Sequence, residues 1–193
     1  MITNTILRII TICLFLILHI YWRLKHKGIK KIFEFKKQPF QNIFHKSVFS
    51  YAQVIVLLQL FGLTIFPIPS LSSLIKILSV LLTLSGFIIC ITARQSLGES
   101  WTNAEDYKEK RKFKLINSGI YKFVRHPIYS GLNMMITGAE ILAQSYVLLL
   151  LPLLYLWTYK QALNEENHLI SLFADKYESY KMETGMFFPR LFK

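Results

Sequence analysis

The chain has 193 residues, of which 53% are hydrophobic and only 18% are charged, and its mean hydropathy is +0.38. This composition excludes an intrinsically disordered or collagen-like chain. The formal net charge of +12 would suit a nucleic-acid-binding protein, but the apolar residues gather in long segments and the basic residues lie between them. We therefore expect an all-α integral membrane protein without a nucleic-acid partner.

The apolar segments, taken in chain order, predict about five transmembrane helices, each of which needs about 20 apolar residues. The last segment is expected to continue as a helix beyond the membrane, through residue 180. Pro67-Ile68-Pro69-Ser70 predicts a tight turn between the second and third segments. The five segments are residues 5–22, 47–66, 71–93, 127–143 and 145–159.

Basic residues are distributed unevenly among the connections. Residues 23–46 hold eight lysines and arginines, residues 94–125 hold eight more, and the turns at 67–70 and 143–146 hold none. Because positively charged loops stay in the cytoplasm, we expect a multi-pass protein with its N-terminus outside and its C-terminal tail in the cytoplasm. The membrane would be a bacterial or archaeal inner membrane or the endoplasmic reticulum.

We expect one membrane domain, residues 1–193. Within it, residues 1–93 would form three spans with the basic loop 23–46, and residues 94–193 would carry the functional part. Cys13 and Cys90 both lie inside apolar segments, so they predict buried small side chains rather than a metal site or a disulfide.

The connector before the fourth segment carries the first chemically informative residues. Asn117-Ser118-Gly119 predicts a turn, and Pro127 is suited to the first turn of a helix. The N-terminus of that helix, with Arg125 beside it, predicts an anion site at the membrane surface. Tyr121 and Tyr129 add flat faces with hydroxyl groups.

Polar residues continue along one face of the fourth segment, at spacings of three and four residues. Such a face either packs against other helices or lines a pocket for a polar head group, and the sequence favours neither. Glu140 lies near the far end of the span, where simple solvation is the cheaper interpretation. The residues are Asn133, Thr137, Glu140 and Gln144.

A second polar cluster follows the fifth segment. Gln161 and Glu165 are one helical turn apart, Glu166 is adjacent, and His168 lies on the face of Gln161. Taken alone, neighbouring glutamates on a helix leaving the membrane are typical of a solvated face.

Together these residues form an ordered series that resembles the isoprenylcysteine carboxyl methyltransferase family, within the wider group of phospholipid methyltransferases. The resemblance covers about residues 94–193. The series is Lys114-Leu115-Ile116, Gly119, Tyr121, Arg125-His126-Pro127, Tyr129 and Gly131, then a pair of spans, Glu165-Glu166, Lys176-Tyr177, Tyr180 and Phe188-Pro189.

The resemblance implies an integral-membrane enzyme that uses S-adenosylmethionine, with the connector, the ends of the last two spans and the C-terminal helical tail forming the cofactor pocket. It implies that the strip Phe113-Lys114-Leu115-Ile116 holds the cofactor largely through backbone, that Tyr121 and residues 126–129 line the rest, and that Glu165 is a polar anchor. The chemistry of the residues adds Arg125 for the cofactor carboxylate. The cofactor-binding set is Phe113, Lys114, Leu115, Ile116, Tyr121, Arg125, His126, Pro127, Ile128, Tyr129 and Glu165.

The expected methyl acceptor is a lipophilic small molecule or lipidated substrate from the bilayer, with an isoprenylated cysteine carboxylate or similar lipid carboxylate favoured. Many family members have an arginine where this chain has Gln161, which weakens the case for a carboxylate; Arg125 or His168 would then take its place. A phospholipid amine is the alternative acceptor, and it would need a base such as Glu166 or His168. The candidate catalytic residues are thus Gln161, Glu166 and His168.

Two other classes of protein remain as alternatives. An NADPH-dependent sterol or steroid reductase shares an Arg-His-x-x-Tyr-x-Gly element, but such enzymes usually have more spans and an acidic–Cys signature in the tail. This chain has no cysteine after Cys90. A non-enzymatic membrane scaffold would use the basic loops on anionic lipid and would not need the ordered series.

Overall fold

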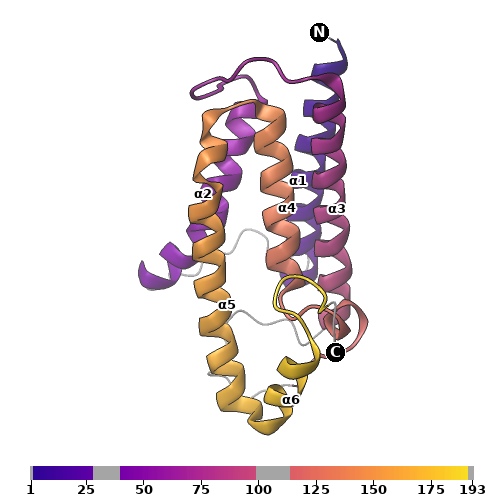
Figure 1. Ribbon diagram of the computed structural model, residues 1–193, viewed down its shortest axis with the longest axis vertical. Coiled ribbons are helices and arrows are strands. Elements are labelled where there is room, and N and C mark those ends of the chain that lie inside the picture. The colour runs from indigo at the N-terminus through magenta and orange to yellow at the C-terminus, as the bar shows by residue number, and fades with distance from the viewer. Residues whose placement is uncertain (1, 28–39, 99–113, 191–193) are drawn as a thin grey trace. The chain divides into compact units, whose positions relative to one another are not determined.

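The structure is a computed structural model that describes residues 2–27, 40–98 and 114–190 (Figure 1). These residues form helices and two isolated bridges, with no strand among them, so the predicted all-α fold is confirmed. The α-helices are α1 (Ile2–Lys27), α2 (Phe40–Leu60), α3 (Ser73–Leu97), α4 (Pro127–Ala143), α5 (Leu151–Phe173) and α6 (Asp175–Glu183). Two 3₁₀ helices, η4 (Gly119–Lys122) and η5 (Tyr146–Leu150), precede α4 and α5.

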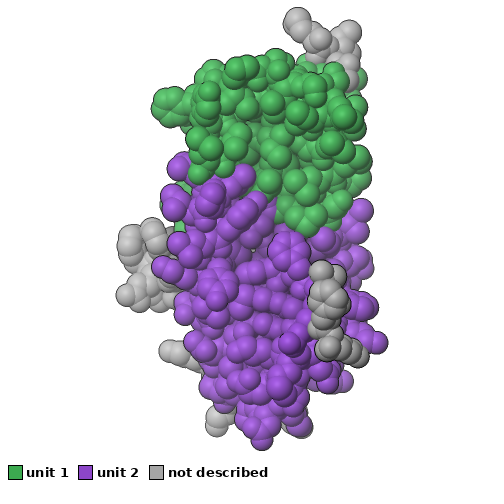
Figure 2. Space-filling view, in the orientation of Figure 1, with its two compact units in different colours: residues 1–87, 134–149 green, residues 88–133, 150–193 purple. Residues whose placement is uncertain are grey.

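The chain divides into two compact units, coloured separately in Figure 2. Unit 1 comprises residues 1–87 and 134–149, and unit 2 comprises residues 88–133 and 150–193. Residues 134–143, the second half of α4, thus belong to unit 1. The assignment of the functional part to residues 94–193 stays a prediction.

Among the described residues, three helical segments are long and apolar enough to cross a membrane: Asn4–Lys25, Ser73–Leu97 and Tyr146–Phe173. The apolar part of α2, Val48–Leu60, is shorter, and α4 has 17 residues. Many large apolar side chains on these helices are exposed, including Ile17 and Leu81, as expected of surfaces that face lipid. The count of five spans stays a prediction.

Helix ends agree with the sequence in places and differ in others. The fourth segment coincides with α4, Pro127–Ala143. The helix α2 ends at Leu60, before the predicted end at residue 66, because Gly62 takes a left-handed φ of 107° and turns the chain. The expected continuous helix from 145 to 180 is wrong, since residues 146–150 are 3₁₀ and the chain breaks at Ala174, whose φ is 47°.

Small residues bring α3 and α4 close together inside unit 1. Ser79, Thr83 and Gly138 are all buried, and a Cβ atom added to Gly138 would collide with the Ser79 carbonyl oxygen and the Thr83 hydroxyl. Thr83 Oγ1 also donates to the Met135 carbonyl at 3.5 Å. The small-residue face of the third segment is therefore a helix-packing surface.

Glu140 and Gln144, two polar residues of α4, find partners within unit 1. Glu140 is 2% exposed, and both its oxygens accept hydrogen bonds from Gln59 Nε2, at 3.0 and 3.1 Å. Gln144 Oε1 accepts from the Leu71 backbone N–H at 2.8 Å. For these two residues, the polar face of α4 serves helix packing and loop attachment rather than a pocket.

Unit 2 contains a sharp turn that brings the end of the chain back toward the connector. At Ala174 the chain leaves α5 and starts α6, which Figure 1 shows turning back from the end of α5. The turn buries Tyr177 and Tyr180, and their rings meet edge to face at 5.8 Å. Tyr180 donates its hydroxyl hydrogen to the Tyr121 carbonyl at 2.6 Å.

Candidate active site

The connector turns at Gly119, as the Asn-Ser-Gly sequence predicts. Gly119 has a φ of 62°, a left-handed conformation that favours glycine. A Cβ atom there would also lie 2.5 Å from Ser96 Oγ at the end of α3. Both the backbone angle and the close approach explain why the motif has glycine at this position. Directly after the turn, η4 buries Tyr121.

The tail that follows α6 lies beside the last residues of the connector. Arg125 N–H donates to the Gly185 carbonyl at 2.9 Å, and His126 N–H donates to the Met186 carbonyl at 3.0 Å. In return, Gly185 N–H donates to the Phe123 carbonyl at 3.2 Å. The tail therefore occupies backbone donors that the sequence had offered to an anion at the start of α4.

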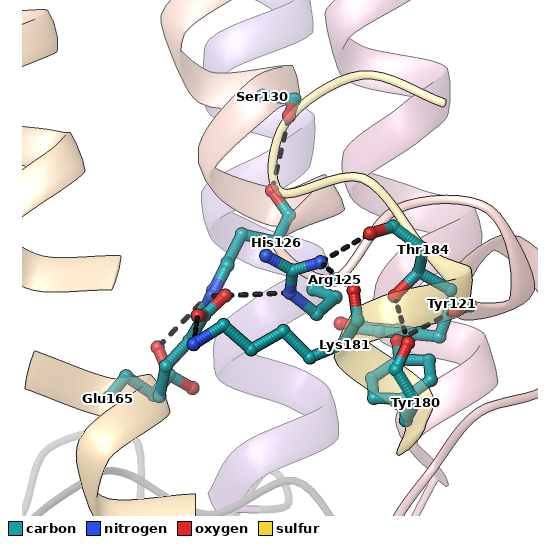
Figure 3. A network of polar contacts seen from close by, with 9 residues as sticks. Tyr121, Arg125, His126, Ser130, Glu165, Tyr180, Lys181 and Thr184 are labelled. Carbon is teal, nitrogen blue, oxygen red and sulfur yellow. Dashed lines mark hydrogen bonds and ion pairs between the residues drawn. The ribbon is translucent and has the colours of Figure 1, made fainter. Parts of the chain in front are cut away.

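Arg125 joins three parts of unit 2 (Figure 3). Its Nε donates to Glu166 Oε1 on α5 at 2.7 Å. Its Nη1 donates to the Lys181 carbonyl at 3.1 Å and to the Thr184 carbonyl. The side chain is only 8% exposed. The planar guanidinium suits this arrangement because its donors point in several fixed directions.

His126 lies between the two adjacent glutamates of α5. Its Nε2 is 3.2 Å from Glu166 Oε1, and its Nδ1 is 3.8 Å from Glu165 Oε2. Because a carboxylate only accepts, the hydrogen bond to Glu166 requires a proton on Nε2. The ring stacks on Tyr129, with centroids 5.6 Å apart and planes at 17°. These contacts fix the orientation of the imidazole.

The two glutamates have different surroundings. Glu166 is 1% exposed, and its Oε2 has no hydrogen-bond partner among the described residues, although Lys181 Nζ lies 3.7 Å away. Glu165 is 31% exposed. Glu166 is thus surrounded by Arg125, His126 and Lys181, whereas Glu165 keeps a partly open carboxylate beside His126.

Tyrosines near the cluster stay protonated. Burial raises the pKa of Tyr180 to about 12, although Arg125 nearby opposes the shift. Burial also raises the pKa values of the Tyr121 and Tyr177 phenols above their usual range, with nearby glutamates adding to the effect. These hydroxyls therefore act as neutral hydrogen-bond donors rather than as bases.

Other predicted site residues lie around this cluster. Phe113 is outside the described residues. Lys114 is exposed, Leu115 and Ile116 are half-buried, and their backbone belongs to no helix or strand and makes no backbone hydrogen bond within the described part of the chain. Pro127 is buried at the start of α4, and the half-buried Ile128 accepts a weak hydrogen bond from Cys90 Sγ at 3.7 Å.

The three candidate catalytic residues are placed differently along α5. Glu166 is buried in the cluster, Gln161 is half-buried, and His168 is exposed. His168 follows Glu166 by two residues, which places the two side chains on roughly opposite sides of the helix. The structure therefore brings Arg125, His126, Glu165 and Glu166 together and leaves His168 on another face.

The sequence did not point to Lys181, Thr184 or Gly185 as part of this cluster. Their only signal is the spacing after Tyr180 and before Phe188-Pro189. A Cβ atom on Gly185 would collide with the Phe188 carbonyl, so this glycine allows the tail to fold tightly. In the described residues, no group of three or more metal-ligating side chains is found.

Comparison with known proteins places this geometry in a family. The sequence profile of the phospholipid methyltransferase family matches residues 74–176. A protein-S-isoprenylcysteine O-methyltransferase of Schizosaccharomyces pombe is 32% identical over 100 residues, which are 51% of this chain and 42% of that protein. Methanethiol S-methyltransferase 1 of Bradyrhizobium diazoefficiens is 36% identical over 70 residues, which are 36% and 24% of the two chains.

A solved structure agrees at the level of fold. The eukaryotic intramembrane Ras methyltransferase (isoprenylcysteine carboxyl methyltransferase) superposes with a TM-score of 0.59 and 17% identity, covering 88% of this chain and 59% of that one. This chain therefore matches about half the length of such relatives.

Fold and apolar helices together define an integral membrane protein whose polar cluster is built from the connector, α5 and the tail. The chain belongs to the phospholipid methyltransferase family. Its resemblance to the isoprenylcysteine carboxyl methyltransferases is confirmed by both the sequence and the fold comparisons.

Proposed function

We propose that this protein is an S-adenosylmethionine-dependent methyltransferase acting on a lipophilic acceptor that enters from the bilayer. The observation that carries the proposal is the meeting of Arg125-His126 with Glu165-Glu166 and the tail in one buried cluster of unit 2. These residues come from separate motifs of the ordered series found in the sequence. A scaffold that only binds anionic lipid would not need them to converge.

The residues present fit the cofactor. Glu165, with its partly open carboxylate, suits the α-amino group or the ribose hydroxyls. The backbone N–H and C=O groups of residues 114–116 make no backbone hydrogen bond within the described part of the chain, as required for binding through backbone. Tyr129 and His126 offer stacked rings for adenine.

When bound, S-adenosylmethionine supplies an activated methyl group for in-line displacement. The residues' task is then alignment of the acceptor and exclusion of water, more than acid–base assistance. A carboxylate acceptor is already ionised near neutral pH and needs no base. We favour the carboxylate of an isoprenylated cysteine or a similar lipid.

An amine acceptor is the second candidate, and one observation favours it. Gln161 replaces the arginine that the family uses toward a carboxylate, and it is half-buried on α5 one turn before Glu165. A phospholipid amine must lose a proton before it attacks. Glu165 keeps a partly open carboxylate for this role, whereas the neighbouring Glu166 is enclosed by Arg125 and Lys181.

Binding of the cofactor is the first test. Calorimetry on the detergent-purified protein should show micromolar binding of S-adenosylmethionine and S-adenosylhomocysteine, and Glu165→Ala should weaken it at least about tenfold. Glu178→Ala, on the exposed side of α6, is the matched control and should bind like the wild type. A folded wild-type protein that binds neither ligand would refute the methyltransferase proposal and turn attention to NADPH.

Acceptor chemistry is the second test. Radiolabelled methyl transfer to a farnesylated cysteine should give a base-labile methyl ester, whereas transfer to phosphatidylethanolamine gives a base-stable amine. Gln161→Arg should increase the ratio of carboxylate to amine methylation if residue 161 faces the acceptor. An unchanged ratio would remove Gln161 from the substrate site.

The proposal also includes the orientation of the chain in the membrane. We place the N-terminus outside and the tail in the cytoplasm, because the basic residues lie at 23–46 and 94–125. Reporter fusions at residues 69 and 190 should report opposite sides of the membrane. Reporters on the same side would refute this topology.

A further inference from the structure

Arg125 binds Glu166 and two backbone carbonyls, rather than presenting its charge to a ligand. Glu166 Oε1 accepts from Arg125 Nε at 2.7 Å and from His126 Nε2 at 3.2 Å. The side chains of Arg125 and Glu166 are 8% and 1% exposed. A guanidinium enclosed in this way is poorly placed to bind the carboxylate of a cofactor, which is the role its sequence position had suggested.

The other hydrogen bonds of Arg125 are donated to carbonyl groups at the end of α6 and the start of the tail. Nη1 donates to the carbonyls of Lys181 and Thr184, at the end of α6. The next residues then pair with the connector through backbone bonds at Gly185 and Met186. Ser130 Oγ, in the first turn of α4, donates to the Phe187 carbonyl at 2.8 Å. One ion pair thus sits where α5, α6, the connector and the tail join (Figure 3).

We propose that Arg125 and Glu166 are positioning residues that fasten tail residues 184–187 to the connector and thereby hold His126 beside Glu165. The link to the cofactor rests on the function proposed above, whereas the fastening of the tail does not. In this arrangement Glu165 and His126 contact the ligand, and Arg125 and Glu166 act through them.

The geometry explains why arginine and glutamate are needed here. Lysine has one compact ammonium group and cannot reach a carboxylate on one side and two carbonyls on the other with fixed directions. Glutamine at position 166 would keep an acceptor but leave the buried guanidinium without a counter-charge, which is costly. Both Arg125→Lys and Glu166→Gln should therefore loosen the tail without removing bulk.

Hydrogen exchange measured on the full chain in detergent, without any ligand, tests the fastening. In Arg125→Lys and Glu166→Gln, peptides covering residues 123–126 and 184–188 should exchange at least about tenfold faster than in the wild type. Lys122→Arg and Glu178→Gln, both at exposed positions, are matched controls and should exchange like the wild type. Peptides from α1 serve as the internal control for global folding.

Two results of this experiment would overturn the proposal. Unchanged exchange in the tail would show that the ion pair does not hold it. Faster exchange throughout the chain, α1 included, would show that the pair supports the whole fold instead of the tail.

Chemical rescue separates positioning from general loss of structure. In Arg125→Ala, low-millimolar guanidinium should restore slow exchange of the tail peptides, whereas ammonium at equal ionic strength should not. Absence of rescue, with the variant otherwise folded, would count against a directional role for the guanidinium.

Cofactor binding then tests the second half of the proposal. The dissociation constant for S-adenosylmethionine should rise about tenfold in Arg125→Lys and Glu166→Gln, in parallel with tail exchange. A loosened tail with unchanged binding would overturn the link to the cofactor. Absence of binding in the wild type would instead refute the proposed function, and the exchange data would still decide whether the tail is fastened.

Discussion

Among the residues that the structure describes, each compact unit buries one glutamate, and the two glutamates have very different partners. In unit 1, Glu140 meets the neutral amide of Gln59. In unit 2, Glu166 is surrounded by Arg125, His126 and Lys181. Both side chains are almost fully buried, so burial alone does not distinguish them.

The partners reveal what each glutamate holds together. The Glu140–Gln59 contact joins two apolar helices and ends there. The Glu166 contacts continue through Arg125 into the backbone of α6 and the tail, so several loops depend on one carboxylate. A buried acid with a single neutral partner is thus a packing contact, whereas one with several cations organises a site.

Substitution of the two glutamates should give the largest difference between the two units in their effect on stability. Glu166→Ala leaves Arg125 buried without its counter-charge and should destabilise the protein by about 3–5 kcal/mol. Glu140→Gln keeps a hydrogen-bonding group opposite Gln59 and should change stability by no more than about 1 kcal/mol. Thermal unfolding in detergent measures both, and equal losses would contradict the distinction.

Close helix packing in unit 1 should be the next most sensitive feature. Gly138→Ala places a methyl group against the Ser79 carbonyl, so α3 and α4 must separate, at a cost of about 1–3 kcal/mol. Ser85→Ala, on the exposed side of α3, should have little effect. If S-adenosylmethionine binding is measured as well, the Gly138 variant should keep it, since the contact lies outside unit 2.

Removal of one hydroxyl in unit 2 should have a smaller effect. Tyr180→Phe loses the hydrogen bond to the Tyr121 carbonyl and should cost about 1–2 kcal/mol. Tyr146→Phe, at an exposed position, is the control. Unfolding that is insensitive to Tyr180→Phe would show that the bond is not formed in solution.

The same tyrosine gives a pH dependence. Its pKa is raised from 10.0 to about 12 in the folded protein, so folding favours the neutral form. The resulting stability is fully present below pH 10 and is lost as the pH rises through about 12. The wild type should therefore lose more stability than Tyr180→Phe between pH 10 and 12, as followed by thermal unfolding.

The smallest effect is expected at Lys181. Its ammonium lies 3.7 Å from Glu166 Oε2 but is 38% exposed, so solvent screens the pair. Lys181→Gln should cost at most about 1 kcal/mol, far less than Glu166→Ala. A loss as large as that of Glu166→Ala would mean that Lys181, rather than Arg125, neutralises the carboxylate.

Much of the fold was predictable because apolar length and turn residues are local signals. The extent of α4 and the turn at Gly119 both followed from the sequence. The break at Ala174 did not, because alanine favours helix and only the burial of Tyr177 and Tyr180 explains the change of direction.

Most side chains of the candidate site could be named from the sequence, but the contacts between them could not. The motifs named Arg125, His126, Glu165 and Glu166, yet sequence spacing cannot tell which of two adjacent glutamates faces a buried arginine. Thr184 takes part through its backbone carbonyl, and Lys181 through both its carbonyl and its ammonium group. Backbone acceptors leave no trace in residue identity, and so they could not be found in advance.

The pairing of residues 184–187 with the connector also has a consequence for biosynthesis. These residues are translated after all the helices described here. The polar cluster can therefore close only after α5 and α6 have been synthesised, as a late folding step. Until α5 and α6 are made, Arg125 lacks the groups that enclose it in the folded protein, namely the Glu166 carboxylate and the carbonyls of Lys181 and Thr184.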